Sequence, residues 1–332
     1  MVDEHCYNSE LIGNYQIGNE EDSLYIFDYS TDNFEVEHID EKKALYISSI
    51  LNTYQNFDHH LYKSLIKDIH IKEKITYTSS KNFIIQTAGS IIFEVGGALI
   101  NNGTGSIILK SGIEGKECEG NNKCSSILFQ GEKPQIILGN KNANNFVKLF
   151  YNPEKSQEFH KYQNPNNFDD YILPSNKAIS YMLVNSIYDL QIINLFLSGN
   201  YALSTNIDAS VTKEWDSGKG FLPLGRENHP FSGNFAGNGY NISALYINRP
   251  EQDNVGLFGF TSGGVFNFNK ITDTRINSYN IIGHNNVGLL IGTAFFTEIS
   301  GINYDDKSIL QGIKFTDNIV GKGPVSKKSQ IC

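Results

Sequence analysis

The feature that most constrains this chain is a run of short apolar segments that recur every seven to nine residues, apart from one step of 20 residues. They begin at residues 75, 83, 91, 98, 107, 127 and 136, and glycine, asparagine or serine lies between most of them. Asparagine and glycine tolerate the left-handed backbone of tight turns, and the chain holds 38 Asn and 30 Gly against 8 Pro. Short strands separated by such turns are typical of a sandwich, a barrel or a β-solenoid. Hairpin signals such as Asn-Gly are few, and three steps make one coil of roughly 25 residues, so we predict a β-solenoid.

The net charge of −9 is concentrated at the N-terminus, where residues 1–60 hold 13 acidic side chains and two lysines. Nucleic-acid binding needs clustered lysine and arginine, which the sequence does not show, so no nucleic-acid partner is expected. No window approaches the about 18 consecutive apolar residues of a membrane span. The opening segment MVDEHCYNSE has neither the basic nor the apolar region of a signal peptide. Taken alone, these observations predict a cytoplasmic chain without a membrane span.

The composition changes along the chain and predicts five regions. Residues 1–70 form a divergent acidic region, in which 23–30 and 44–51 are expected to be strands or buried segments and 59–74 a short helix. Residues 71–150 carry the regular coils, and 151–199 form a polar, proline-containing connector that ends in a short amphipathic helix. Residues 200–320 form a second repetitive region, with expected strands over 200–210, 221–225 and 230–248, and 321–332 form a tail.

An Asn-Val-Gly-Leu phrase occurs twice in the second region, as DNVGLFGF at 253–260 and NNVGLLIG at 285–292. The recurrence indicates a repeating structural unit and not a reactive site. Apolar positions of the phrase are expected to fill the core and its glycines to let the chain bend, while three earlier glycines are expected at turns or bulges where a side chain would clash with a neighbouring coil. The predicted structural residues are Gly233, Gly237, Gly239, Val255, Gly256, Leu257, Gly259, Val287, Gly288, Leu289 and Gly292.

Residues 180–292 resemble the GLUG-motif segment of filamentous-haemagglutinin-type adhesins, the exported proteins of bacterial two-partner secretion systems. The family has a Tyr-x-Leu and Ile-Asp-Ala strand, a Trp, Gly-Phe-x-Pro-x-Gly, Phe-x-Gly-x-Phe-x-Gly-x-Gly, a Leu-x-Ile strand and Gly-Leu-x-Gly. The matching residues are Tyr201, Leu203, Ile207, Asp208, Ala209, Trp215, Gly220, Phe221, Pro223, Gly225, Phe231, Gly233, Phe235, Gly237, Gly239, Leu245, Ile247, Gly256, Leu257 and Gly259.

The resemblance implies a right-handed parallel β-helix, so with the short helix and the irregular N-terminal region read from the residues themselves the expected fold is all-β. It also implies a surface or secreted location and a role in attachment to a receptor or glycan on a host or neighbouring cell. In that family export uses an outer-membrane transporter of the two-partner type. The chain lacks the family's export signal and secretion domain and is shorter than its members, so we expect a fragment of a longer adhesin or the product of a split or decaying gene.

An enzymatic alternative is considered because many parallel β-helices cleave polysaccharides. That chemistry needs paired carboxylates on one face of consecutive coils. The candidates are Asp169-Asp170, Asp305-Asp306 and Asp208. The two pairs lie in connector-like sequence, where solvated carboxylates are usual, and Asp208 is interpreted as a residue that caps a turn, so no catalytic residue and no cofactor is predicted.

Three other groups of residues invite a functional interpretation. His59-His60 with His70 suggests a metal site, but a solvated helix start is the preferred interpretation, so no metal is predicted. The only tryptophan, Trp215, is interpreted as an apolar plug in preference to a sugar-stacking ring. Cys118 and Cys124 flank a turn-forming Gly-Asn-Asn and form either a disulfide or two reduced thiols. Asn102 and Asn241 begin short N-glycosylation patterns, a weak signal in an Asn-rich chain.

Three hypotheses therefore follow from the sequence. The first is a non-enzymatic fragment of a surface adhesin that binds through exposed ladders and loops. The second is a carbohydrate-active β-helix enzyme, and the third is a remnant that is not exported.

Overall fold

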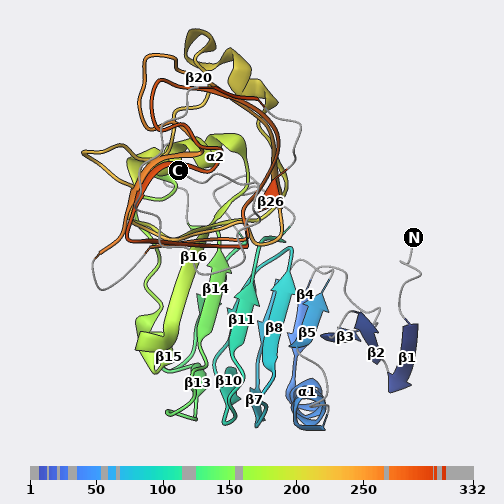
Figure 1. The fold of residues 1–332 in the computed structure, drawn as a ribbon. Coiled ribbons are helices and arrows are strands. Elements are labelled where there is room, and N and C mark those ends of the chain that lie inside the picture. Colours follow the sequence, from blue (N-terminus) through green and yellow to red (C-terminus); the bar gives the residue numbers. More distant parts are fainter. Residues whose placement is uncertain are drawn as a thin grey trace. The chain divides into compact units, whose positions relative to one another are not determined.

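A computed structural model of the chain describes residues 7–12, 15–20, 23–28, 36–53, 59–64, 68–113, 125–153, 160–264, 269–301, 303–304 and 309–311. Short strands with mainly parallel partners dominate these residues (Figure 1), so the expected all-β class is confirmed. The chain forms two compact units. Unit 1 comprises Met1–Lys155 and Asn166–Tyr181, and unit 2 comprises Ser156–Pro165 and Met182–Cys332.

The strands of unit 1 form three sheets. Sheet A has the order β1-β2-β3-β5-β8-β11-β14-β16, sheet B the order β12-β9-β6-β4 and sheet C the order β15-β13-β10-β7. From β5 to β11 consecutive strands enter sheets A, B and C in turn, and in Figure 1 β5, β8, β11 and β14 lie side by side. The strand bounds are β1 Tyr7–Ile12, β2 Tyr15–Glu20, β3 Ser23–Asp28, β4 Val36–Ile39, β5 His59–Ser64, β6 Asp68–Ile71, β7 Lys74–Tyr77, β8 Asn82–Thr87, β9 Ile91–Phe93, β10 Ala98–Asn101, β11 Ile107–Lys110, β12 Ile127–Phe129, β13 Ile136–Leu138, β14 Val147–Tyr151, β15 Ile172–Leu173 and β16 Ala178–Val184.

The core of unit 1 consists of apolar columns that run from strand to strand. In sheet C the parallel register aligns Ile75, Leu99, Ile136 and Ile172, which are at most 2% exposed. Burying one such side chain stabilises the fold by roughly 1.5–3 kcal/mol. All seven apolar runs predicted between 75 and 138 are strands, and each places at least one apolar side chain in the core.

In the N-terminal region the strand expected within 23–30 is present as β3, whereas the strand alternative for 44–51 and the helix expected over 59–74 are wrong. Residues 44–51 lie within a helix, α1 Glu41–Thr53, whose buried residues Ala44, Ile47 and Ile50 recur every three positions. The Asp40 side chain accepts a hydrogen bond from the Lys43 amide at 3.0 Å and caps its first turn. Residues 59–74 are not a helix but contain β5, β6 and the first residue of β7, because Ile69 and Ile71 alternate with period two.

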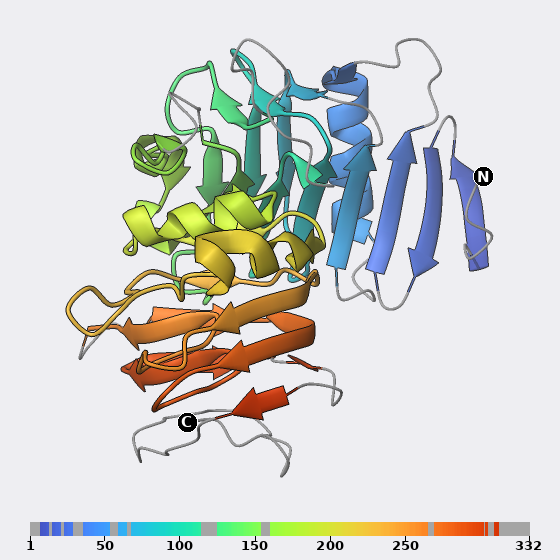
Figure 2. The same ribbon diagram turned by 90° about the horizontal axis from the view of Figure 1, so that it is seen from above.

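Unit 2 repeats the same rotation among three sheets. Sheet D holds the end of β16 with β17, β19, β22 and β25, sheet E holds β18, β20, β23, β26 and β27, and sheet F pairs β21 with β24. Figure 2 shows these orange-to-red strands stacked on one another. The bounds are β17 Tyr201–Leu203, β18 Ile207–Asp208, β19 Phe235–Ala236, β20 Asn241–Asn248, β21 Phe258–Ser262, β22 Asn269–Thr272, β23 Arg275–Ile282, β24 Ile291–Phe295, β25 Thr297–Ser300, β26 Asn303–Tyr304 and β27 Ile309–Gln311.

Besides α1, the helical segments among the described residues are short. They are η3 Asp169–Tyr171 and η4 Ser175–Lys177 in unit 1, and α2 Ile187–Ile192, η5 Ile193–Leu195 and η6 Ser210–Gly218 in unit 2. The amphipathic helix expected before residue 199 is therefore shorter than predicted, with Leu190 and Ile193 buried but Leu195 exposed. Residues 221–225 are not a strand and form a single parallel bridge at Leu224. Among the described residues no helix is long and apolar enough to cross a membrane.

Candidate functional site

The two copies of the Asn-Val-Gly-Leu phrase lie directly against each other. Val255 forms a parallel bridge with Val287, and the Leu257 amide donates to the Leu289 carbonyl at 3.2 Å. Val255, Leu257 and Val287 are at most 2% exposed. The second copy differs, because Leu290 is the buried leucine while Leu289 is only half-buried. The 32 residues between the two copies of the phrase are therefore the length of chain that separates one copy from the copy paired with it.

An asparagine pair links the two copies on the outside of the bridge. The Asn286 Nδ2 donates to Asn254 Oδ1 at 2.9 Å, and the Thr293 hydroxyl donates to the same oxygen at 2.6 Å. Both asparagines have left-handed backbone, with φ of 58° at Asn254 and 54° at Asn286. Asparagine suits both roles, because it tolerates this conformation and its amide can donate and accept along a ladder.

Asn254→Ala is expected to destabilise the chain by about 1–3 kcal/mol, because it removes the ladder acceptor and keeps a Cβ at positive φ. Asn254→Gly removes the same hydrogen bonds but favours the left-handed backbone, so it is expected to be about 1 kcal/mol less destabilising. Urea unfolding of the two variants measures the difference. Equal stabilities for Asn254→Gly and the unchanged chain would show that the ladder contributes nothing.

The predicted glycines lie where neighbouring backbone leaves no room. A Cβ on Gly233 would lie 1.7 Å from the Gly199 carbonyl oxygen, and one on Gly237 would lie 1.9 Å from that of Asp273. Gly239 has open space around it and a φ of 87°, so its requirement is conformational. In the phrase a Cβ would meet a backbone atom within 2.8 Å at each of the remaining positions, Gly256, Gly259, Gly288 and Gly292.

The carboxylates considered for catalysis make local contacts. Asp208 accepts from the Ser210 amide at 2.9 Å, and this hydrogen bond is the main cause of the lowered pKa of its carboxyl group. Asp170 pairs with Lys133 at 2.7 Å on the surface of unit 1. Asp305-Asp306 lies outside the described residues, as do Cys118 and Cys124.

A group of apolar side chains at the surface of unit 2, the apolar patch, comprises Tyr188 on α2, Leu195 on η5, Trp215 on η6 and Leu222 beside α2. Tyr188, Leu195 and Leu222 are 59%, 58% and 46% exposed. The half-buried Trp215 ring lies 5.3 Å from the ring of the exposed Tyr188, so the interpretation of Trp215 as an apolar plug stays a prediction. The Gln191 side chain donates to the Leu222 carbonyl and accepts from its amide, both at 2.9 Å, which holds Leu222 beside α2.

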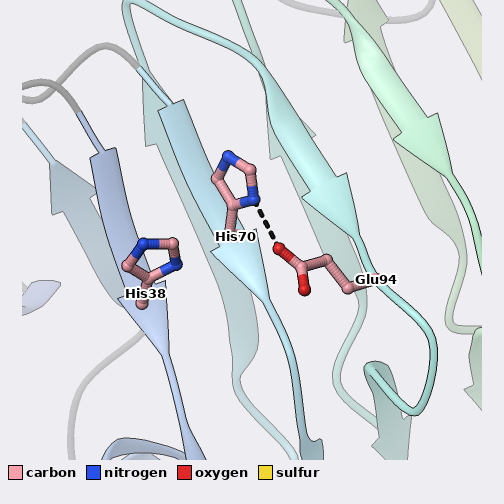
Figure 3. Close-up of side chains that lie close together, drawn as sticks. All are labelled: His38, His70 and Glu94. Atoms are coloured by element: carbon pink, nitrogen blue, oxygen red, sulfur yellow. Dashed lines mark hydrogen bonds and ion pairs between the residues drawn. The ribbon is translucent and has the colours of Figure 1, made fainter.

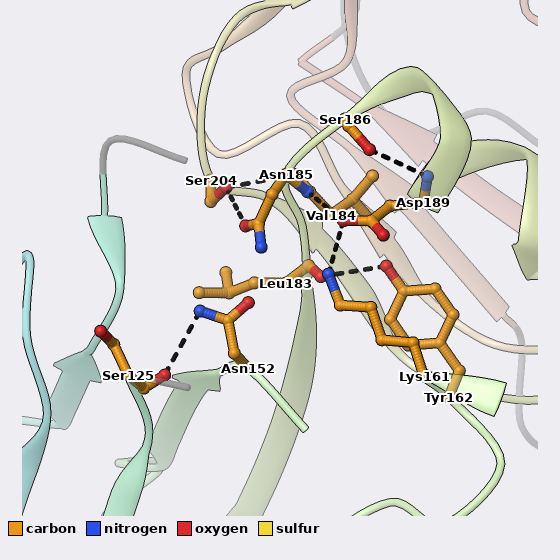
Figure 4. Close-up of polar contacts among 10 residues, drawn as sticks. All are labelled: Ser125, Asn152, Lys161, Tyr162, Leu183, Val184, Asn185, Ser186, Asp189 and Ser204. Carbon is orange, nitrogen blue, oxygen red and sulfur yellow. Dashed lines mark hydrogen bonds and ion pairs between the residues drawn. The ribbon is translucent and has the colours of Figure 1, made fainter. Parts of the chain in front are cut away.

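A buried ion pair lies beneath α2 (Figure 4). Lys161 Nζ lies 2.5 Å from Asp189 Oδ2, and the two side chains are 1% and 9% exposed. The same carboxylate oxygen accepts from the Asn185 amide at 3.0 Å, and the Tyr162 hydroxyl donates to the Leu183 carbonyl at 3.0 Å. Burial, with the Asp189 charge second, raises the pKa of Tyr162 well above its usual value, so this hydroxyl stays a donor. The pair is buried, and it links the segment that contains Lys161 to α2.

A cluster of potential metal ligands occurs on sheet B of unit 1 (Figure 3). His38 on β4 and His70 on β6 are register partners, and their rings lie 5.2 Å apart. Glu94 follows β9, and its Oε1 lies 2.6 Å from His70 Nδ1. One ligand atom of each residue lies within 4.8 Å of the others. Partial burial, followed by the charges of Lys72 and His70, lowers the pKa of His38, which favours a neutral ring with a free lone pair.

The hypothesis that His59 and His60 lie beside His70 is wrong. His59 and His60 lie on β5 of sheet A, whereas His70 lies on β6 of sheet B. The actual neighbours of His70 lie 32 residues before it and 24 residues after it. The signal that could have found Glu94 was the interval between parallel partner strands, because Ile75 pairs with Leu99 and Phe83 with Ile107, each 24 residues further on.

Comparisons with known proteins find similarity only to short parts of much larger chains. Over 150 residues the chain is 32% identical to halomucin of Haloquadratum walsbyi. This similarity covers 41% of this chain and 2% of halomucin. Over 78 residues it is 32% identical to a protein of Evansella cellulosilytica named as a putative Gly-rich membrane protein. This similarity covers 23% of this chain and 9% of that protein. No family model and no solved structure matches the chain.

Proposed function

We propose that both units are coils of a right-handed parallel β-solenoid and that the chain is part of a non-enzymatic, filamentous-haemagglutinin-like bacterial adhesin of the GLUG type. The support for the solenoid is the rotation of successive parallel strands among three sheets in each unit. Right-handedness follows from the strong preference of parallel crossover connections.

The observation that carries the proposal is the stacking of the two phrases that define the resemblance. Val255 lies opposite Val287, and Asn254 is hydrogen-bonded to Asn286. Val255, Leu257 and Val287 of the two phrases are packed in the core. Solenoids built this way offer extended, rigid surfaces on which exposed side chains make contacts.

The apolar patch supports attachment as the role of unit 2. A group of large exposed apolar side chains is typical of an interaction surface. The Tyr188 and Trp215 rings combine an apolar face with a polar edge, which suits a protein receptor or the face of a sugar. The partner in this proposal is a receptor or glycan on a host or neighbouring cell. The location is the cell surface or the medium, reached through a two-partner outer-membrane transporter.

Adhesion of beads coated with the chain to cultured host cells or to a glycan array tests the proposal. Tyr188→Ser with Leu222→Ser is expected to weaken binding about tenfold or more, because aromatic anchors dominate such contacts. The matched control is Val95→Ser with Leu128→Ser, which removes two exposed apolar side chains from unit 1 and is expected to leave adhesion unchanged. Absence of binding to any cell or glycan would contradict the proposed function, and equal loss in both double variants would contradict the role of the patch.

A further inference from the structure

We propose that His38, His70 and Glu94 bind one divalent transition-metal ion, with Zn²⁺ as the preferred ion, at the outer face of sheet B. The site joins three adjacent strands, because His38 lies on β4, His70 on β6 and Glu94 directly after β9. The inference is independent of the adhesin proposal, since it concerns unit 1 and needs no receptor.

The ligand chemistry favours a borderline metal. Two imidazoles and one carboxylate form the donor set of many zinc sites in which one coordination position stays open, and imidazole is a poor ligand for Ca²⁺ or Mg²⁺. In this part of the chain His38 makes no hydrogen bond to any described residue, so a ring nitrogen is available, while Glu94 supplies negative charge beside His70. An ordinary ion pair would use only His70 and Glu94 and would leave His38 without a role.

The distances fit a site that closes around an ion. Metal–ligand bonds of about 2.0–2.2 Å place the ligand atoms of a tetrahedral ion roughly 3.4 Å apart. The present separations range from 2.6 Å for the His70–Glu94 pair to an upper limit of 4.8 Å. Binding therefore widens the first contact and draws His38 inward, which rotation of exposed or half-buried side chains allows. On binding, His70 takes the tautomer that keeps its proton on Nε2, so the proton leaves Nδ1, and Nδ1 and Glu94 Oε1 become ligands of the same ion.

Two nearby lysines are expected to weaken the binding of Zn²⁺. Lys72 and Lys43 act electrostatically on His38, and their positive charges also repel a dication. With three protein ligands and this repulsion, we expect weaker binding than at closed four-ligand zinc sites. The expected consequence is a brace across β4, β6 and β9, because an ion bound to the folded chain shifts the unfolding equilibrium.

The experiment is calorimetric titration of ZnCl₂ into the metal-stripped full chain with its four cysteines alkylated, so that thiolates cannot bind the ion. One ion per chain is expected, together with a melting temperature that rises with Zn²⁺ concentration. Co²⁺ should give a visible spectrum of nitrogen and oxygen ligands. His38→Gln, His70→Gln and Glu94→Gln are each expected to weaken binding at least tenfold, and circular dichroism in the absence of metal checks that each variant folds.

The matched control is His284→Gln. His284 also pairs with a carboxylate, Asp253, at 2.8 Å on an exposed surface, but this pair is not part of a three-ligand cluster among the described residues. Zinc binding should be unchanged in this variant. No heat of binding for Zn²⁺ or Co²⁺, or equal affinity in Glu94→Gln and the unchanged chain, would overturn the proposal. Loss of binding in His284→Gln alone would place the ion elsewhere and would overturn it as well.

Discussion

Asp189→Ala is expected to lower the free energy of unfolding by about 3–5 kcal/mol, the largest effect of any single charge removal considered for this chain. The change leaves the Lys161 ammonium group buried without its carboxylate partner, and it removes the acceptor of the Asn185 amide. The desolvation of an unpaired charge, rather than the loss of attraction alone, is the reason for the size of the effect. Urea unfolding followed by circular dichroism measures it.

The exposed Lys133–Asp170 pair supplies the control for this prediction. Its Nζ–Oδ2 distance is 2.7 Å, close to that of the buried pair, but its side chains are 47% and 75% exposed. Asp170→Ala should therefore cost less than about 1 kcal/mol. The double change Lys161→Met with Asp189→Leu should recover most of the lost stability, because no charge remains in the interior. A cost below 1 kcal/mol for Asp189→Ala would contradict the buried ion pair.

Phe258→Ala is the second large prediction, with an expected loss of about 3–5 kcal/mol. Phe258 belongs to the first copy of the repeated phrase and is fully buried. Its ring lies 4.9 Å from that of Phe231 and 5.3 Å from that of Phe235, so alanine leaves a cavity beside these two aromatic rings. Thermal or urea unfolding of the variant gives the change in stability.

Phe260, two residues further on, tests whether this effect comes from burial. Its ring is only partly buried and stacks on Phe295, which is 40% exposed. Phe260→Ala removes the same atoms but is expected to cost about 1 kcal/mol, since little buried apolar contact is lost. Similar losses in the two variants would contradict the assignment of Phe258 to the core.

The strands of residues 75–138 could be predicted because each run begins after a turn and carries an alternating apolar set. Leu99 and Ile136, for example, each lie in a period-two pattern whose inward side is fully buried. The helix α1 could not be recognised in the same way, because residues 44–51 are rich in Ile, Ser and Tyr. Its helical signals are the cap at Asp40 and the three-residue spacing of the buried positions.

The His38, His70 and Glu94 cluster could not be predicted because strand stacking alone brings its members together. Local sequence places His70 near His59 and His60, but the chain turns from sheet A to sheet B between β5 and β6. Only the intervals between parallel partner strands, 32 residues from His38 to His70 and 24 residues from His70 to Glu94, relate the members to one another. In unit 2 the corresponding interval is visible in the sequence, because the same phrase recurs 32 residues later.

The most direct test of the stacked-coil account is a disulfide across β20 and β23. In a chain whose native cysteines are replaced by serine, Ser243→Cys with Asn277→Cys joins register partners. Adjacent parallel strands lie about 4.8 Å apart, within the Cα range of a disulfide. Ser243→Cys with Arg275→Cys is two positions out of register, at roughly 7–8 Å. The account predicts an intramolecular cross-link in the first pair and little in the second, whereas equal yields, or cross-links only between molecules, would contradict it.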